Sequence, residues 1–144
     1  MSSSPPPATV PLADPATATG KVAEVFADIM QVKGIDFVPR FWRALAVNPD
    51  HLESVWRQLK YWMHPEACGR EPKLDARTRE MIAIAVSATN GCSYCVNSHT
   101  ATAQKLGMDA ATLGEVLAIA GLFNMTNALA DGMQIEPDVR PSFE

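Results

Sequence analysis

Residues 80–99 read EMIAIAVSATNGCSYCVNSH, and this stretch is the most informative part of the chain about its fold. The first nine residues are mostly apolar and contain no glycine or proline, which predicts a helix over Glu80–Ala88. Asn90-Gly91 predicts the end of that helix, because glycine readily adopts the left-handed conformation that closes many helices. A second helix is expected to begin at or near Cys92. The stretch therefore predicts two consecutive helices joined by a tight turn.

The rest of the chain also has helical periodicity, and no segment shows the alternation of a strand. Asn48 and Pro49 are typical of a helix start, and Asp75 and Asp109 are positioned to cap two further helices. Gly34 and Gly107 are expected to end helices. The expected helices begin near Lys21, Pro39, Pro49, Asp75, Cys92 and Asp109, with a loop over 64–73 between the third and the fourth.

These features predict an all-α fold, a compact bundle of about six helices within one domain over residues 21–132. Residues 1–20 contain five prolines among Ser, Ala and Thr, which predicts a flexible arm. Residues 133–144 are expected to form a polar tail. The helices over Glu80–Ala88 and Leu113–Leu129 are apolar on nearly all sides, and a domain of 144 residues has limited room to enclose both. We therefore expect a homo-oligomer.

Composition and charge exclude several classes of function. Apolar residues make up 47% of the chain and charged residues 19%, as in a folded globular protein, and the net charge is −4. No dense Lys/Arg stripe is present, so no nucleic-acid partner is expected. No basic n-region with an apolar core opens the chain, and no apolar run approaches the roughly 20 residues that cross a bilayer. We therefore expect no membrane partner and a cytoplasmic location.

Cys92, Cys95 and His99 form the candidate site. Each residue of an α-helix advances by about 100°, so Cys95 is offset from Cys92 by about −60° and from His99 by about 40°. All three side chains are expected on one face, with the two thiols close enough to form a disulfide. Both thiols lie at the start of a helix, where free N–H groups and the helix dipole stabilise a thiolate. The spacing predicts dithiol redox chemistry.

Glu80 completes the candidate site if the two helices pack antiparallel. It lies twelve residues before Cys92, and a carboxylate on the inner face of the first helix would orient His99. This depends on the packing of the two helices, because a glutamate near a helix start is usually solvated.

The set Glu80, Cys92-Ser93-Tyr94-Cys95 and His99 resembles the Glu-x(11)-Cys-x-x-Cys-x-x-x-His pattern of AhpD-like alkylhydroperoxidases in the carboxymuconolactone decarboxylase superfamily. The likeness covers roughly residues 22–130. It implies an all-helical protein that assembles as a trimer or hexamer and that reduces hydroperoxides. Tyr94 is a departure, because the well-studied AhpD proteins have a histidine at this position, and this bears on the peroxidase rate and the recycling partner.

The resemblance also implies a role for each residue. Cys95 would be the thiol oxidised by peroxide, Cys92 the resolving thiol, His99 the base and Glu80 its partner. The sequence itself leaves the order of the two cysteines open, because Cys92 lies nearer the helix start. In the expected cycle Cys95 becomes a sulfenic acid, Cys92 condenses with it to a disulfide, and a dithiol donor restores both thiols. No flavin, haem or metal is required. The donor would be a lipoyl or thioredoxin-like protein.

Three other interpretations of these residues remain. Two thiolates and an imidazole also suit zinc, with Glu80 or His64 as a fourth ligand, although no second Cys/His pair is present. A lactone or decarboxylation enzyme of the wider superfamily is the second, and a helical scaffold whose cysteines sense oxidation is the third. Cys68, His51 and His64 are expected to be spectators or structural residues.

Overall fold

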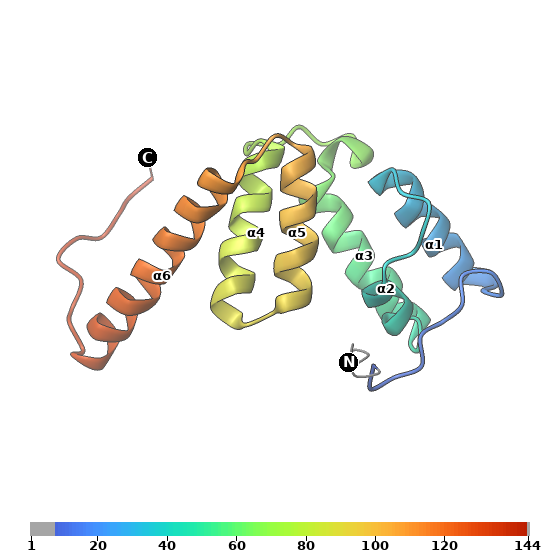
Figure 1. Cartoon of the computed structure of the whole chain (residues 1–144), viewed down its shortest axis with the longest axis horizontal. Coiled ribbons are helices and arrows are strands. Elements are labelled where there is room, and N and C mark those ends of the chain that lie inside the picture. Colours follow the sequence, from blue (N-terminus) through green and yellow to red (C-terminus); the bar gives the residue numbers. More distant parts are fainter. Residues whose placement is uncertain (1–7, 144) are drawn as a thin grey trace. The chain divides into compact units, whose positions relative to one another are not determined.

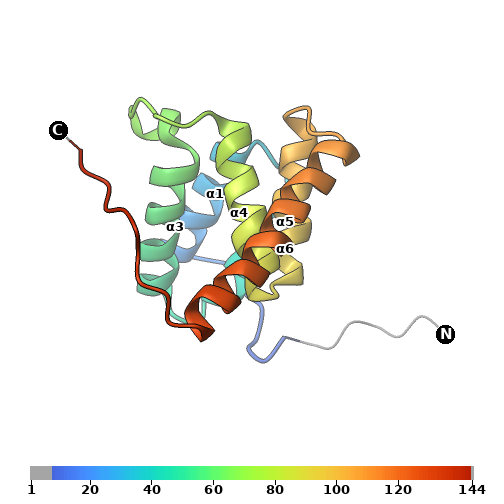
Figure 2. The same cartoon turned by 90° about the vertical axis from the view of Figure 1, so that its left-hand side faces the viewer.

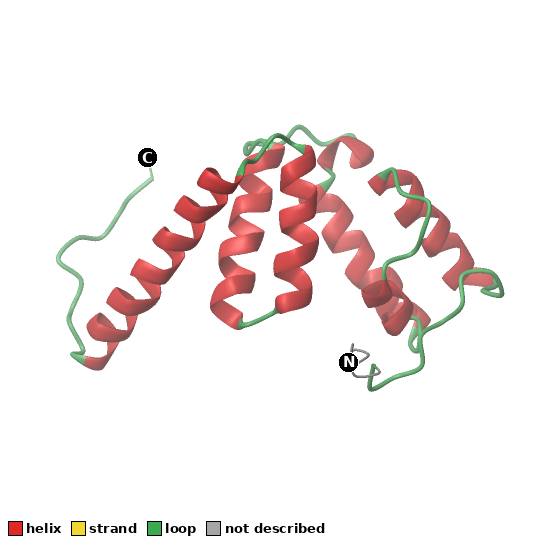
Figure 3. Ribbon diagram, in the orientation of Figure 1, coloured by secondary structure: helices red, strands yellow, loops and turns green. Residues whose placement is uncertain are grey.

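The computed structural model describes residues 8–143, and every regular element in that range is helical (Figure 3). This confirms the predicted all-α fold. The helices are α1 (Gly20–Lys33), α2 (Arg40–Leu45), α3 (Pro49–Met63), the short 3₁₀ helix η1 (Pro65–Cys68), α4 (Ala76–Asn90), α5 (Ser93–Lys105) and α6 (Ala110–Gly132) (Figure 1). The expected helix starts are within one or two residues of the observed ones. The expected loop over 64–73 differs, because Pro65–Cys68 form one tight helical turn closed by Gly69.

The chain divides into two units, Met1–Lys73 and Leu74–Glu144. The first comprises α1, α2, α3 and η1, and the second comprises α4, α5 and α6. The sequence did not suggest a division at this point, and the single domain over 21–132 stays a prediction. All of the candidate site residues fall within the second unit.

The first unit has a well-filled apolar core. α1 and α3 pack together, and Trp42 of α2 meets Trp56 of α3 in an edge-to-face arrangement at 5.2 Å between ring centroids. The residues fully enclosed in this core are Val25, Phe26, Ile29, Val38, Trp42, Leu52 and Trp56. They come from α1, α2, α3 and the loop before α2, so burial of this one apolar surface holds the unit together.

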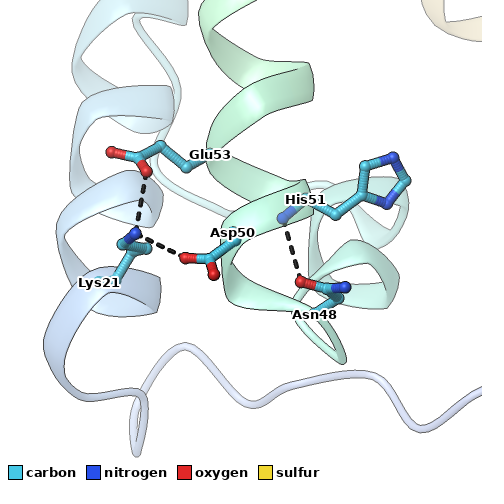
Figure 4. Close-up of polar contacts among 5 residues, drawn as sticks. All are labelled: Lys21, Asn48, Asp50, His51 and Glu53. Carbon is cyan, nitrogen blue, oxygen red and sulfur yellow. Dashed lines mark hydrogen bonds and ion pairs between the residues drawn. The ribbon is translucent and has the colours of Figure 1, made fainter.

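Polar contacts at its edge join α1 to α3 (Figure 4). Lys21 on α1 contacts Asp50 at 2.7 Å and Glu53 at 3.0 Å, both in the first turns of α3. These two carboxylates raise the pKa of Lys21 through hydrogen bonds. Asn48 caps α3, as predicted, by accepting a hydrogen bond from the backbone N–H of His51 at 3.2 Å. These contacts are exposed, so they add little to the stability of the unit.

The predicted N-terminal arm is only partly within the described residues, because residues 1–7 lie outside them. Residues 8–19 contain turns and neither a helix nor a strand, and the flexibility of the arm stays a prediction. The end of this segment is nevertheless attached to the first unit. Ala13 donates its N–H to the Arg43 carbonyl at 3.1 Å and accepts a hydrogen bond from the Arg43 guanidinium at 2.8 Å.

The second unit is a helical hairpin with one further helix packed on it. α4 lies beside α5 in Figures 1 and 2, and the chain reverses at Gly91, whose φ of 72° is the left-handed conformation that favours glycine. α4 also packs against α6, which runs diagonally across the hairpin in Figure 2. Asp75 and Asp109 cap α4 and α6 through the backbone N–H groups of Thr78 and Thr112, as predicted.

The core of the second unit is small. Ile84, Ala103 and Met108 are its buried apolar residues, with Met81, Leu113 and Val116 partly buried around them. α6 has no buried residue at all along its described length. Much of the apolar surface that the sequence places on α4 and α6 is therefore exposed in the single chain.

Candidate redox site

The site is built on the α4–α5 hairpin. Cys92 is the N-cap of α5, and Cys95 follows in the first turn of that helix. Their sulfurs are joined in a disulfide, with Cα atoms 5.3 Å apart. The sequence expectation that one helical turn brings the two thiols within bonding distance is confirmed. Cys68 is the remaining cysteine; it is exposed, has no disulfide partner and lies in the first unit.

Glu80 and His99 meet across the hairpin. The Glu80 carboxylate accepts a hydrogen bond from Nδ1 of His99 at 2.7 Å. The Glu80 side chain is 8% exposed and that of His99 is 24% exposed, so the pair is largely shielded from water. Glu80 is also the one residue that is both buried and charged among those the structure describes. The contact that depended on antiparallel packing is therefore confirmed.

This contact determines which nitrogen of the imidazole is available. Because Nδ1 is engaged by the carboxylate, Nε2 is the nitrogen that is left for proton transfer. His99 lies four residues after Cys95 on the same helix, which places the ring one turn, about 6 Å of helix rise, beyond that cysteine. In the disulfide form no hydrogen bond is present between His99 and either sulfur among the described residues. A short movement or a bridging water is thus needed for contact with a thiol.

Cys92 has a contact that the sequence did not identify. Its sulfur accepts a hydrogen bond from the backbone N–H of Cys95 at 3.2 Å, in the way that a serine or aspartate oxygen caps a helix. The sequence placed both thiols near the first turn of α5 and did not distinguish them. The identity of the capping residue depends on where the backbone leaves the extended conformation, and here Cys92 is the last extended residue (φ −93°, ψ 90°).

His64, the possible zinc ligand outside the hairpin, and the expected spectators Cys68 and His51 do not belong to the second unit. The Nδ1 atom of His64 lies 3.9 Å from Glu66. Among residues 8–143, no group of three or more His, Cys, Asp or Glu side chains is arranged to hold a metal ion.

The chain is similar to known proteins over the region that holds this site. The sequence profile of the carboxymuconolactone decarboxylase family matches residues 59–135, which is more than half of the chain. The chain belongs to the carboxymuconolactone decarboxylase family. The match includes α4, the Cys-x-x-Cys hairpin and α6, and thus all four residues of the candidate site.

Within the carboxymuconolactone decarboxylase family the chain is AhpD-like. It is 48% identical to the solved alkylhydroperoxidase AhpD core from Rhodospirillum rubrum, over 91% of this chain and 94% of that one, with a TM-score of 0.82. The alkyl hydroperoxide reductase AhpD of Streptomyces coelicolor is 30% identical over 63% of this chain and 49% of its own length. That of Coxiella burnetii is 36% identical over 37% of this chain and 30% of its own. The chain thus spans a third to a half of these curated relatives.

Proposed function

We propose that this protein is a thiol-dependent peroxidase and disulfide oxidoreductase that reduces hydroperoxides through Cys92 and Cys95. The observation that supports it most is the buried 2.7 Å contact between Glu80 and His99, one helical turn from a Cys-x-x-Cys disulfide. A structural disulfide needs no such neighbour, whereas proton transfer at a thiol does. The names of the AhpD relatives point to the same activity.

The proposed oxidative half-reaction takes the order of the two cysteines from the AhpD resemblance, and the Glu80–His99 contact supports the role of His99. The Cys95 thiolate attacks the outer oxygen of a hydroperoxide, the O–O bond breaks, and the alkoxide that leaves is protonated to an alcohol. Cys95 is then a sulfenic acid. Cys92 attacks the sulfur of Cys95, the S–O bond breaks, and hydroxide leaves as water after taking up a proton. His99, positioned by Glu80, supplies and removes these protons through Nε2.

A dithiol donor completes the cycle. Its first thiolate attacks the disulfide to give a mixed disulfide, and its second thiol displaces the enzyme, so that two electrons and two protons pass to Cys92 and Cys95. We propose a lipoyl or thioredoxin-like protein as this donor. We also propose a cytoplasmic location, since a reducing compartment keeps such a donor in its dithiol form. The cycle itself uses side-chain sulfur and needs no bound flavin, haem or metal.

Peroxide consumption tests this proposal. With a dithiol such as dithiothreitol as reductant, the wild type should consume an alkyl hydroperoxide and Cys95→Ser should not. Cys68→Ser removes a thiol outside the site and is the matched control, which should retain the wild-type rate. Thiol titration after one equivalent of peroxide should show Cys92 and Cys95 lost as a pair. If both remain free after peroxide, the proposal is wrong.

Three further measurements on the wild type and the cysteine variants separate the other candidate functions. Turnover of a lactone that survives loss of Cys95 would favour decarboxylase chemistry. A changed assembly state without turnover would favour a redox-sensing scaffold. One zinc ion per chain in the reduced protein, lost in Cys92→Ser and Cys95→Ser, would favour a metal site.

We also propose that the chain functions as a homo-oligomer. One face of α6 exposes large apolar side chains, among them Ile119 (52% exposed), Leu122 (50%) and Phe123 (55%). On α4, Ile82 and Val86 are 49% and 53% exposed. α6 is the one described helix long and apolar enough to span a membrane by length and composition. A second copy of the chain explains the exposure better, because Glu80–Ala88 and α6 would then share one apolar interface.

A further inference from the structure

The two sulfurs of the site lie in different electrostatic surroundings. The backbone N–H of Cys95 points at the sulfur of Cys92, and Cys92 occupies the N-cap of a thirteen-residue helix. A disulfide sulfur is a weak acceptor, and a thiolate is a strong one. The same N–H therefore interacts more favourably with Cys92 once the disulfide has been reduced. The dipole of α5 acts in the same direction, because its positive end lies at the N-cap.

The Glu80–His99 pair lies nearer to the other cysteine along α5. His99 lies four residues after Cys95 and seven after Cys92, which corresponds to about 6 Å and about 10 Å of helix rise. In the proposed cycle Cys95 exchanges protons with the imidazole, whereas Cys92 has the backbone N–H of Cys95 as a polar partner. The two thiols are activated by two different features of the fold.

Among the described helices of the second unit, the last turn of α4 and the first turn of α5, which flank Cys92, hold no charged side chain. The titratable and charged side chains on the three helices of this unit are Arg77, Arg79 and Glu80 on α4, Tyr94, His99 and Lys105 on α5, and Glu115 and Asp131 on α6. Those on α4 lie in its first two turns, at the far end from Gly91 and Cys92.

We propose that Cys92 holds the stable thiolate of the reduced site and is the leaving group when the disulfide is reduced. This assignment rests on the proposed redox function for its role in the cycle. A donor thiolate attacks the Cys95 sulfur, the Cys92–Cys95 bond breaks, and its electron pair stays on Cys92 as a thiolate held by the Cys95 N–H. The second donor thiol then releases Cys95, which takes up a proton, and the donor becomes a disulfide. In the oxidative half-reaction Cys92 attacks the Cys95 sulfenic acid without needing a base, because it is already a thiolate.

Alkylation of single cysteines tests the assignment. Each of Cys95→Ser and Cys92→Ser retains one thiol of the pair, and serine at position 92 still caps the helix. An ordinary thiol of pKa about 8.5 is about 1% ionised at pH 6.5. In reduced Cys95→Ser we expect Cys92 to react with iodoacetamide at pH 6.5 about tenfold faster than Cys95 does in Cys92→Ser. The pH at which Cys92 reacts at half its maximal rate should lie at least about one unit below that of an ordinary thiol. Peptide mapping separates both from Cys68.

Glu80→Gln added to each variant separates the two activating features. The pH profile of Cys92 should not move, because the backbone N–H is untouched, whereas that of Cys95 should. In urea both thiols should titrate together, because the helix is lost. The assignment is overturned if Cys95 reacts as fast as or faster than Cys92, or if Glu80→Gln moves the profile of Cys92. Absence of peroxide turnover with these profiles intact would instead reject the proposed function and leave the thiolate assignment standing.

Discussion

At the scale of single residues, the proposed chemistry depends on one hydrogen bond. His99 has rotational freedom as a side chain, and the Glu80 carboxylate at 2.7 Å holds it in one orientation and one tautomer. A group that transfers protons is effective only when it is within hydrogen-bond reach of the reacting atom. The pair is therefore a positioning device for His99 as much as an electrostatic one.

Replacing Glu80 should reduce turnover while the fold persists. Glu80→Gln has nearly the same shape and still offers an acceptor, but it lacks the charge that stabilises a protonated imidazole. We expect peroxide consumption to fall by about 10- to 100-fold, which is less than for loss of a general acid–base group itself because Glu80 acts through His99. The assay is peroxide loss with dithiothreitol, and circular dichroism checks the fold. Glu24→Gln on α1, at an exposed position of the first unit, is the matched control. An unchanged rate in Glu80→Gln would exclude the proposed role.

A second residue-scale contact stabilises the first unit. Asp28 on α1 accepts hydrogen bonds from the indole of Trp56 at 2.7 Å and from Lys60 at 2.9 Å, both on α3. Burial raises the pKa of Asp28, but the hydrogen bonds from Trp56 and Lys60 outweigh it and lower the pKa below 3.8. A lowered carboxyl pKa stabilises the folded state above the unfolded value and ceases to do so as the pH falls through the folded one.

Asp28→Asn should thus destabilise the first unit at neutral pH and have less effect in acid. The Asp28 side chain is 37% exposed, so solvent screening limits the expected loss to on the order of 1 kcal/mol at pH 7. The difference from wild type should persist down to about pH 4 and shrink below it. Urea unfolding followed by tryptophan fluorescence measures it, since all three tryptophans lie in this unit. Asp36→Asn, at an exposed position, controls for the lost charge. If Asp28→Asn and the wild type differed in the free energy of unfolding by the same amount at pH 7 and pH 3, the lowered pKa of Asp28 would not stabilise the fold.

At the scale of elements, the hairpin of α4 and α5 positions all four candidate residues. Glu80 comes from one helix and the cysteines and His99 from the other, so the distance between Glu80 and His99 depends on how the two helices pack. Ile84 on α4 is completely buried and belongs to the small core that joins α4, α5 and α6. Few other buried side chains hold these helices together in the second unit.

Removing this side chain should loosen the hairpin. Ile84→Ala leaves a cavity that the small core cannot refill, and we expect a loss of about 2–5 kcal/mol in the free energy of unfolding. Ile135→Ala, at a position 62% exposed in the C-terminal segment, is the matched control and should have little effect. Far-UV circular dichroism in urea measures both. A cost for Ile84→Ala no larger than that of the control would show that the packing seen in the second unit does not stabilise it.

At the scale of the whole molecule, the second unit exposes more apolar surface than a stable monomer usually does. The exposed residues Ile119, Leu122 and Phe123 recur at helical spacing on α6, which makes them one continuous face. Only Glu115 and Asp131 carry charge on that helix. An interface between copies would bury this face and complete the core of the unit.

A charge placed on this face should dissociate the assembly. Phe123→Glu would have to bury an unpaired carboxylate, which costs several kcal/mol and makes association unfavourable. Light scattering should give a multiple of 15.6 kDa for the wild type and a smaller multiple for the variant. Gln31→Glu adds the same charge at an exposed position of α1 and should leave the mass unchanged. A wild type with the mass of one chain would refute the oligomer, and recovery in the membrane fraction would favour a bilayer as the partner of α6.

The sequence by itself determined the helices and the candidate site. Capping residues, glycine stops and apolar periodicity act over a few neighbours, so Asp75, Gly91 and Asp109 could be placed without tertiary information. The spacing of Cys92, Cys95 and His99 within one helix is equally local. Only the tertiary structure decided that Glu80 faces His99, that Cys92 rather than Cys95 accepts the capping N–H, and that the chain forms two units. The physical reason is that these features depend on how helices pack and where the backbone turns into a helix, which local preferences leave undetermined.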